Sequence, residues 1–190
     1  MMFDDFIVDL KTHGISEDTV CVHSRRGGDT PGYESKWKIY YRSKKYPHVG
    51  VLTTFESDTE ICRDGDAKFR AEIENYTTLR GAGYDVPNIY GETIVIDDIL
   101  NDEKSKAALI VEHIDGVGPF KPRTEVRTII LALRNKGFDK EIYIDAWGKL
   151  STCASEIAPS DLQVMFTTDG RIVTIDPEHI GGPLDLPAFN

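Results

Sequence analysis

The spacing of apolar and polar residues along the chain predicts a mixture of helices and strands. In several segments apolar residues recur every three or four positions, as in helices with one buried face. These predicted helices cover residues 3–13, 66–80, 124–136 and 140–156. Other segments show alternating or short continuous apolar runs between turn residues, which is typical of strands. These predicted strands cover residues 20–23, 36–43, 49–55, 92–97 and 107–113, with a hairpin over 162–176.

The hairpin has the most specific local signal. Val164–Phe166 and Ile172–Ile175 flank a Thr-Thr-Asp-Gly turn, and Asp-Gly between β-branched runs predicts a tight turn because both residues tolerate positive φ. Asp161 precedes the first strand and Asp176 follows the second, so both carboxylates should lie at the open end. Two carboxylates on a short rigid hairpin suit Mg²⁺, which prefers oxygen ligands. The alternative is a surface hairpin whose aspartates only cap turns.

The predicted helix 66–80 places a carboxylate among apolar residues. Its apolar face is formed by Phe69, Ile73, Tyr76 and Leu79. At about 100° per residue, Glu72 falls inside this face and Glu74 points to the opposite side. A carboxylate on a buried face needs a partner, because an unpaired buried charge is costly. The alternative is that Glu72 lies at the rim, paired with Arg80 or with water.

Length, composition and charge exclude several classes of protein. A chain of 190 residues with 40% apolar residues forms one domain, or one domain in two small lobes. Its net charge of −10 argues against nucleic acid or an anionic membrane as a partner, since both require a basic footprint. The widely spaced Cys21, Cys62 and Cys153 indicate neither a metal site nor a disulfide framework, and no signal peptide is apparent. We therefore expect a cytoplasmic protein.

Two stretches resemble the protein-kinase-like superfamily, which includes protein kinases and aminoglycoside phosphotransferases. One is the hairpin, with its Asp-Leu-Gln-Val-Met start and its Asp-Gly-Arg-Ile-Val-Thr-Ile-Asp-Pro end. The other is residues 72–91, Glu-x-x-x-Tyr-x-x-Leu-x-x-x-Gly-Tyr-x-Val-Pro-x-Ile-Tyr-Gly, which resembles the third helix of phosphotransferases and the strand after it. The two stretches occur in the order that the family shows. The chain is thus similar to a minimal, truncated kinase such as those of bacterial effectors and phages. An effector or phage protein of this kind would act in the host cytoplasm.

The resemblance implies an α+β, protein-kinase-like fold in a single compact unit of two lobes. Residues 1–114 would form the N-lobe, an antiparallel sheet with the helix 66–80 and a hinge strand over 107–114. Residues 115–190 would form a reduced C-lobe of two helices and the catalytic hairpin 162–176. Gly116, Gly118 and Pro119 would end the hinge strand and form a linker after it.

The resemblance also assigns roles at the hairpin. In this family an aspartate before the hairpin orients the accepting hydroxyl, and an aspartate after it binds Mg²⁺. Asp176 matches the metal-binding aspartate, and Gln163 stands where the family has a metal-binding Asn. Aligned without a gap, Ala158 occupies the catalytic position; with a shortened loop, Asp161 occupies it. Asp161 is the candidate that we carry forward.

The nucleotide contacts follow from the same resemblance. Gly27 and Gly28 lie in a glycine-rich turn that would approach a phosphate, with a plain hairpin loop as the alternative. The strand 49–55 lacks the family's phosphate-binding lysine. Lys38 on the neighbouring strand, paired with Glu72, would take the role of that missing lysine. The alternative is that Lys38 is a solvated surface lysine. The adenine would contact the backbone of Glu112, His113 and Ile114, which would lie on a free strand edge.

The expected function is therefore an ATP- and Mg²⁺-dependent phosphotransferase that acts on a hydroxyl of a protein or a small molecule. The alternative is a kinase-like pseudoenzyme that regulates by binding a host or partner protein. The missing strand lysine and the Gln163 substitution favour this alternative. A third hypothesis is an unrelated α+β protein, which would not bind a nucleotide with Mg²⁺.

Overall fold

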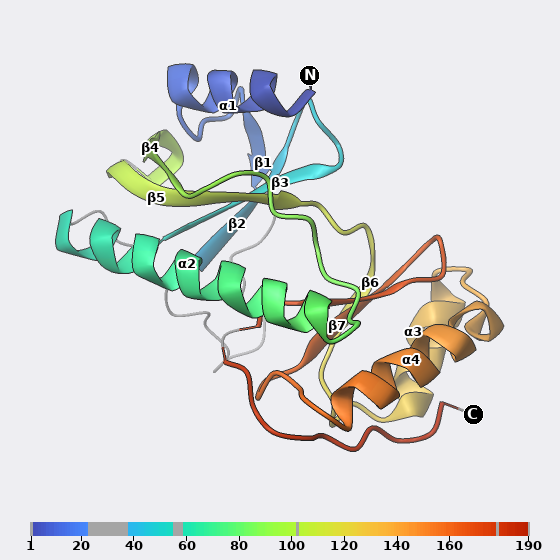
Figure 1. The fold of residues 1–190 in the computed structure, drawn as a ribbon. Helices are drawn as coiled ribbons and strands as arrows, with labels where there is room; N and C mark the ends of the chain where they lie inside the picture. Colours follow the sequence, from blue (N-terminus) through green and yellow to red (C-terminus); the bar gives the residue numbers. More distant parts are fainter. Residues whose placement is uncertain (1, 23–37, 55–58, 102, 178, 190) are drawn as a thin grey trace. The chain divides into compact units, whose positions relative to one another are not determined.

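The computed structural model describes residues 2–22, 38–54, 59–101, 103–177 and 179–189 (Figure 1). The chain divides into two compact units. The first unit contains Met1–Arg70 and Asn88–His113, and the second contains Ala71–Pro87 and Ile114–Asn190. The predicted lobe boundary after residue 114 falls one residue from the division at His113. Residues 71–87, which the prediction assigned to the first lobe, cluster with the second unit.

The first unit is built on an antiparallel sheet of five strands in the order β1-β2-β3-β5-β4. The α+β class and the antiparallel pairing of this sheet are as predicted. Its strands are β1 (Val20–Val22), β2 (Lys38–Ser43), β3 (Val49–Thr54), β4 (Ile94–Asp98) and β5 (Glu103–Glu112). A single helix, α1 (Met2–His13), precedes them.

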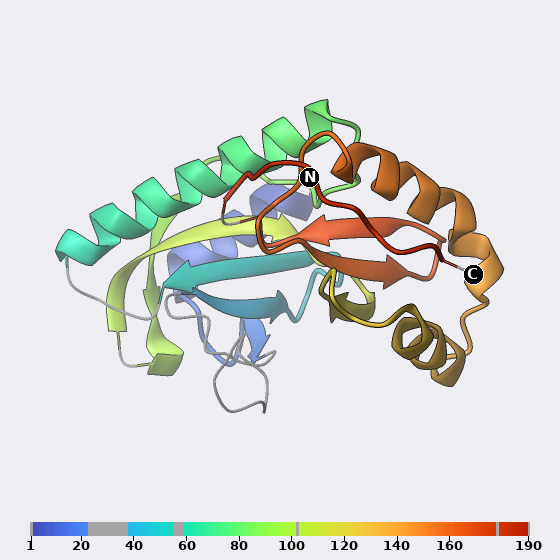
Figure 2. The same ribbon diagram turned by 90° about the horizontal axis from the view of Figure 1, so that it is seen from below.

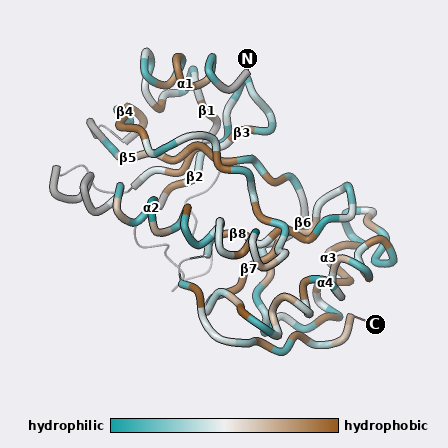
Figure 3. Tube along the Cα trace, in the orientation of Figure 1, coloured by the Kyte–Doolittle hydropathy of each residue, from teal (hydrophilic) through white to brown (hydrophobic). Residues whose placement is uncertain are grey.

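Helix α1 buries one face in the core of the first unit. Phe6 and Leu10 are one helical turn apart and fully buried, and Figure 3 shows hydrophobic and hydrophilic residues alternating along the helix. The core that they join contains residues from several strands, including Tyr41, Val51 and Ile110. The 3.6-residue period in the sequence thus predicted the buried face of α1 correctly.

Strand β5 was expected at a free edge, and this expectation was wrong. It lies between β3 and β4 in the sheet. Residues 88–90, which precede β4 in the chain, lie along the same side of β5. There the Tyr90 N–H donates to the Ile110 carbonyl at 2.9 Å. Apolar runs are shared by central strands and by edge strands with one buried face, so periodicity alone did not distinguish them.

Helix α2 (Thr59–Gly81) is the longest helix and begins earlier than the predicted residue 66. Residues up to Arg70 belong to the first unit, and residues from Ala71 belong to the second. The helix ends where Gly83 adopts a φ of +95°, and the Tyr84 N–H donates to the Leu79 carbonyl at 3.0 Å. A glycine in this conformation commonly terminates helices because it lacks a Cβ.

The second unit contains an antiparallel sheet of three strands in the order β6-β7-β8. The strands are β6 (Gly116–Phe120), β7 (Gln163–Thr167) and β8 (Ile172–Ile175). The helices are α3 (Val126–Asn135) and α4 (Ile144–Ala154), with a 3₁₀ turn over Lys140–Tyr143. The single helix predicted over 140–156 is therefore a 3₁₀ turn followed by a shorter α-helix.

Strand β6 replaces the linker that was predicted at Gly116, Gly118 and Pro119, so that prediction was wrong. A Cβ on Gly116 would lie 2.2 Å from the carbonyl oxygen of Phe166, and one on Gly118 would lie 2.7 Å from that of Val164. These glycines are therefore required by the close approach of β6 to β7. From the sequence alone, they were indistinguishable from glycines that break a strand.

Aromatic rings fill the core of the second unit. Phe166 on β7 contacts the rings of Phe120, Tyr143, Trp147 and Phe189. Phe189 reaches this core from the C-terminal segment, which runs without helix or strand beside the β7–β8 hairpin, as predicted for an extended cover (Figure 2). The Leu184 N–H donates to the Ala154 carbonyl at 2.7 Å and so ties this segment to the end of α4.

Candidate functional site

The β7–β8 hairpin has the two strands and the open end that its sequence predicted. Of the Asp-Gly pair in its turn, only the glycine has a positive φ. Gln163 pairs with Ile175 and Phe166 pairs with Ile172, so Asp161 and Asp176 both lie beyond the last pair, at the open end. At the closed end Gly170 has a φ of +84°. There the Thr167 hydroxyl donates to the Asp169 carboxylate, and the Arg171 Nε donates to it at 2.8 Å. The bond from Thr167, followed by those from Arg171, holds the pKa of Asp169 below its ordinary value of 3.8.

Asp176 is held in an unusual backbone conformation. Its φ is +58°, and among the residues that the structure describes it is the one non-glycine residue with a positive φ. It is only 6% exposed, and its N–H donates to the Tyr76 hydroxyl at 3.0 Å. On the preceding residue of the helix, the Asn75 side-chain amide donates to the Pro177 carbonyl at 2.8 Å. A non-glycine residue in this region costs roughly 1–3 kcal/mol and persists where its surroundings hold it, often at functional sites.

Asp161 carries a carboxylate oxygen that the surrounding protein leaves unsatisfied. Its Oδ1 is buried and has no hydrogen-bond partner in the described part of the chain. Its Oδ2 lies 3.4 Å from the Nε2 of Gln163, which is a long hydrogen bond. Buried polar atoms are nearly always satisfied in folded proteins, so this oxygen is a candidate acceptor or ligand atom for a bound group. The structure thus brings together two predicted site residues, Asp161 and Gln163.

Glu72 lies on the buried face of α2, as its helical phase predicted. It is 3% exposed, one turn before Tyr76 on the same face, whereas Glu74 is exposed. The prediction that these two glutamates differ in burial is confirmed. The partner proposed for Glu72 cannot be placed beside it, since the side chain of Lys38 is outside the described residues. Gly27 and Gly28 are also outside them.

The predicted adenine-binding segment has part of its backbone already hydrogen-bonded. The N–H of Glu112 donates to the Asn88 carbonyl at 2.8 Å, and the N–H of His113 donates to the His48 carbonyl at 2.9 Å. The Glu112 carboxylate accepts from the backbone and side-chain nitrogens of Asn88, each at 3.0 Å. Ile114, the third predicted residue, is half-buried and begins the second unit.

Three residues that hold these sites in place were missed in the sequence. Tyr76 and Asn75 anchor the exit of the hairpin, and Tyr40 hydrogen-bonds the His113 Nδ1 and stacks on its ring at 5.9 Å. The available signal for Tyr76 was a tyrosine on a buried helix face, because a buried hydroxyl usually has a partner. For Tyr40 the signal was an aromatic residue on the polar face of its strand.

The open end of the hairpin carries oxygen atoms of the kind that Mg²⁺ binds. Asp161 and Asp176 carry carboxylates there, and Gln163 carries an amide oxygen. Within the described ranges no group of three or more His, Cys, Asp or Glu residues has an arrangement that would hold a metal. Mg²⁺ usually takes one or two carboxylates and completes its shell with waters and phosphates, so a small donor set suits it.

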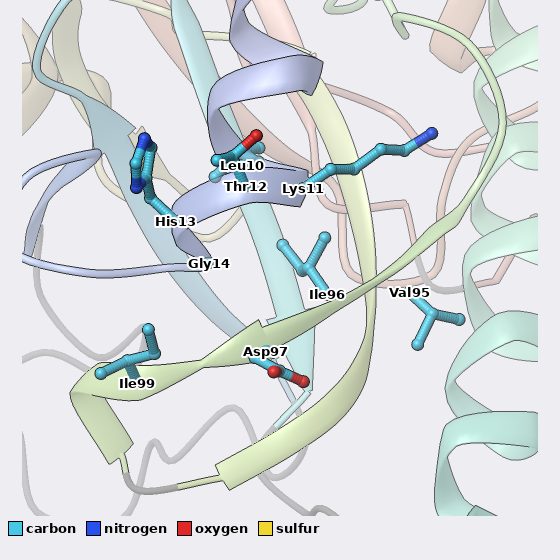
Figure 4. A pocket seen from close by; sticks show the side chains of 9 residues that line it. All are labelled: Leu10, Lys11, Thr12, His13, Gly14, Val95, Ile96, Asp97 and Ile99. Atoms are coloured by element: carbon cyan, nitrogen blue, oxygen red, sulfur yellow. The ribbon is translucent and has the colours of Figure 1, made fainter.

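A hollow of about 220 Å³ lies in the first unit, between the end of α1 and β4 (Figure 4). Its polar side chains are Lys11, Thr12, His13 and Asp97. None of the residues predicted for the functional site lines it. Figure 4 shows Lys11 and Asp97 pointing away from each other rather than converging, so the hollow does not have the character of a binding site.

Comparison with protein-family profiles and with curated proteins finds no match for this chain. In the part of the chain that the structure describes, none of the helices combines the length and the apolar character needed to cross a membrane.

Proposed function

We propose that this chain is an ATP- and Mg²⁺-dependent phosphotransferase of kinase-like fold. The observation that carries the proposal is the open end of the β7–β8 hairpin. There Asp161 has a buried carboxylate oxygen without a partner among the residues that the structure describes, and Asp176 is held at a φ of +58° by α2. Two acids on one rigid hairpin, one strained and one unsatisfied, are expected where a cation and a reacting group are bound.

Each acid has a separate role in the proposal. Bound Mg²⁺ would neutralise charge on the phosphates during transfer. Asp176 would ligate the ion. Its backbone conformation, held by Tyr76, would orient the carboxylate before the ion binds. Gln163 would be a weaker second ligand. Asp161 would accept a hydrogen bond from the incoming hydroxyl, mainly to orient it, because the transition state is loose.

The nucleotide base would be bound by the backbone near the end of β5. Since the N–H groups of Glu112 and His113 are already hydrogen-bonded within the protein, the donor to the base would be the Ile114 N–H. The carbonyls of the same segment would supply the acceptor. Glu72 and Lys38 keep their proposed roles in positioning the phosphates, and the acceptor would be a hydroxyl of a protein or a small molecule.

One observation favours the pseudoenzyme as the second candidate function. Strand β3 contains no lysine, and Thr53, within this strand, is fully buried with its hydroxyl donating to the Ala107 carbonyl at 3.1 Å. This part of β3 therefore serves the sheet and not a phosphate. A pseudoenzyme would act by binding a partner protein, with or without a nucleotide.

The test is a thermal-shift titration with ATP, with and without Mg²⁺, on the parent chain and three variants. A ligand at 100 times its Kd stabilises a protein by about 2.7 kcal/mol. We expect Asp176→Ala to lose the Mg²⁺-dependent shift. Asp169→Asn, at the closed end of the same hairpin, is the matched control and should keep it. A full shift in Asp176→Ala would remove Asp176 as the metal ligand.

Asp161→Asn separates binding from transfer. It should keep the nucleotide-induced shift and lose phosphoryl transfer by roughly 10²-fold or more, the usual effect of losing a general base. Transfer would be measured to added acceptors and to the chain itself. Unchanged transfer in Asp161→Asn would exclude it from the mechanism. Nucleotide binding without transfer in the parent would favour the pseudoenzyme, and absence of nucleotide binding would contradict the phosphotransferase.

A further inference from the structure

Helix α3 presents a face that the described residues of the chain leave exposed. Ile129 and Leu133 are buried on one side of the helix. The opposite side carries five exposed residues at helical spacing: Arg127, Thr128, Leu131, Arg134 and Asn135. Leu131, in the middle, is 47% exposed and lies between the two arginines along the helix. We call this set the α3 face; the helix is labelled in Figure 1.

The α3 face is positively charged in a strongly acidic protein. The chain has a net charge of −10, yet α3 itself contains no acidic residue. Arg127 and Arg134, and the flanking Arg123 and Lys136, are exposed, and their side chains make no hydrogen bond or ion pair with the described residues. By contrast, Arg70 is paired with Asp66 at 2.8 Å and Arg171 with Asp169 at 2.8 Å. The arginines of the α3 face are therefore available to an external anion.

The spacing on α3 specifies the shape of such a partner. At 1.5 Å per residue, Arg127 and Arg134 are about 10 Å apart along the helix axis, with Leu131 between them on the same side. A partner helix lying along α3 would need an acidic residue, an apolar residue and a second acidic residue, three or four positions apart, to contact the two arginines and Leu131. We propose that the α3 face docks an acidic amphipathic helix of a partner protein.

A short acidic helix suits this surface better than a large polyanion. Nucleic acid or an anionic membrane would extend beyond α3 and meet the negative field of the rest of the chain. A helix of a few turns would lie within about one Debye length of the arginines, roughly 8 Å at physiological ionic strength. Leu131 supplies an apolar contact that a phosphate backbone would not use. The inference does not depend on the phosphotransferase proposal.

The probe is a labelled Ala-rich helical peptide with Glu, Leu and Glu in one row, spaced as Arg127, Leu131 and Arg134 are. Binding to the full chain would be measured by fluorescence anisotropy at low and physiological salt. We expect saturable binding that weakens with salt. Arg127→Glu with Arg134→Glu should reduce affinity about tenfold or more, and a peptide with Lys in place of Glu should restore binding to this variant. Leu131→Ala should weaken binding to a smaller degree.

The control variant is Lys11→Glu with Lys44→Glu, which changes net charge equally at exposed sites in the first unit. It should bind the acidic peptide as the parent does. Equal loss in both double variants would show a net-charge effect and overturn the proposal. So would the absence of saturable binding, or Arg127- and Arg134-dependent binding of duplex DNA or anionic vesicles in place of the peptide. Circular dichroism on each variant would confirm that α3 remains folded.

Discussion

At the scale of single residues, the most unusual group is a charged pair inside the core of the first unit. The Nζ of Lys106 lies 3.5 Å from the Oδ2 of Asp98, and both side chains are fully buried. The Tyr41 hydroxyl donates to the same carboxylate at 3.1 Å. Ile96, opposite Lys106 on β4, belongs to the apolar core. Taking two charges out of water is costly, and their attraction offsets that cost only while both partners are present.

Lys106→Met should therefore lower the free energy of unfolding by about 3–5 kcal/mol, because it leaves the Asp98 charge buried without its cation. Lys106→Met combined with Asp98→Leu and Tyr41→Phe should recover most of this loss, since no buried charge remains. Urea unfolding would measure both. Lys45→Met, which removes the exposed pair with Asp9, is the control and should have little effect. If Lys106→Met leaves the free energy of unfolding unchanged, Asp98 does not carry an unsolvated buried charge in the folded protein.

At the scale of elements, the C-terminal segment is an integral part of the second unit. The ring of Phe189 lies 4.9 Å from that of Trp147 and 5.9 Å from that of Phe166. The Trp147 Nε1 donates to the Pro187 carbonyl at 2.9 Å. A segment with neither helix nor strand is thus held by one aromatic anchor and a few hydrogen bonds, so most of its contribution to stability rests on Phe189.

Phe189→Ala should destabilise the protein by about 3–5 kcal/mol, the usual cost of removing a buried phenylalanine. The nearby Asp185→Ala, at an exposed position on the same segment, should stay within about 0.5 kcal/mol of the parent. Denaturant unfolding, followed by tryptophan fluorescence, would report both. Equal stability of the two variants would show that the segment only rests on the surface.

At the scale of the whole molecule, two tyrosines set an alkaline limit to stability. Burial raises the pKa of Tyr84 and of Tyr143 to about 12. Their hydroxyls donate to the Ile157 and Thr167 carbonyls, each at 2.6 Å. A raised pKa in the folded state means that the neutral tyrosine stabilises the fold. Its contribution is complete below the unfolded pKa of about 10 and is lost as the pH rises through 12.

The free energy of unfolding should therefore fall between about pH 10 and pH 12. Tyr143→Phe should be less stable at neutral pH, where it lacks the hydrogen bond, but should show a shallower fall with pH because one ionising group is gone. Guanidinium unfolding at several pH values would measure the slopes, and ultraviolet absorbance would follow tyrosine ionisation. The same slope in parent and variant would show that Tyr143 ionises normally in the folded protein.

The sequence by itself determined the features that depend on neighbours along the chain. The Asp-Gly turn and its flanking β-branched runs produced the β7–β8 hairpin, with Asp161 and Asp176 at its open end. The helical phase of α2 placed Glu72 inside and Glu74 outside. Turn chemistry and hydrophobic period act over a few residues, so one chain is enough to read them.

Only the tertiary structure decided which distant residues meet. The central place of β5, the strand made from Gly116–Phe120, and the bond from Asp176 to Tyr76 all join segments far apart in the sequence. Such pairings depend on which packing best satisfies buried backbone groups and fills the core, and no local pattern encodes this choice. The unsatisfied oxygen of Asp161 and the strained φ of Asp176 likewise exist only in the folded chain, because each is imposed by residues that packing brings beside it.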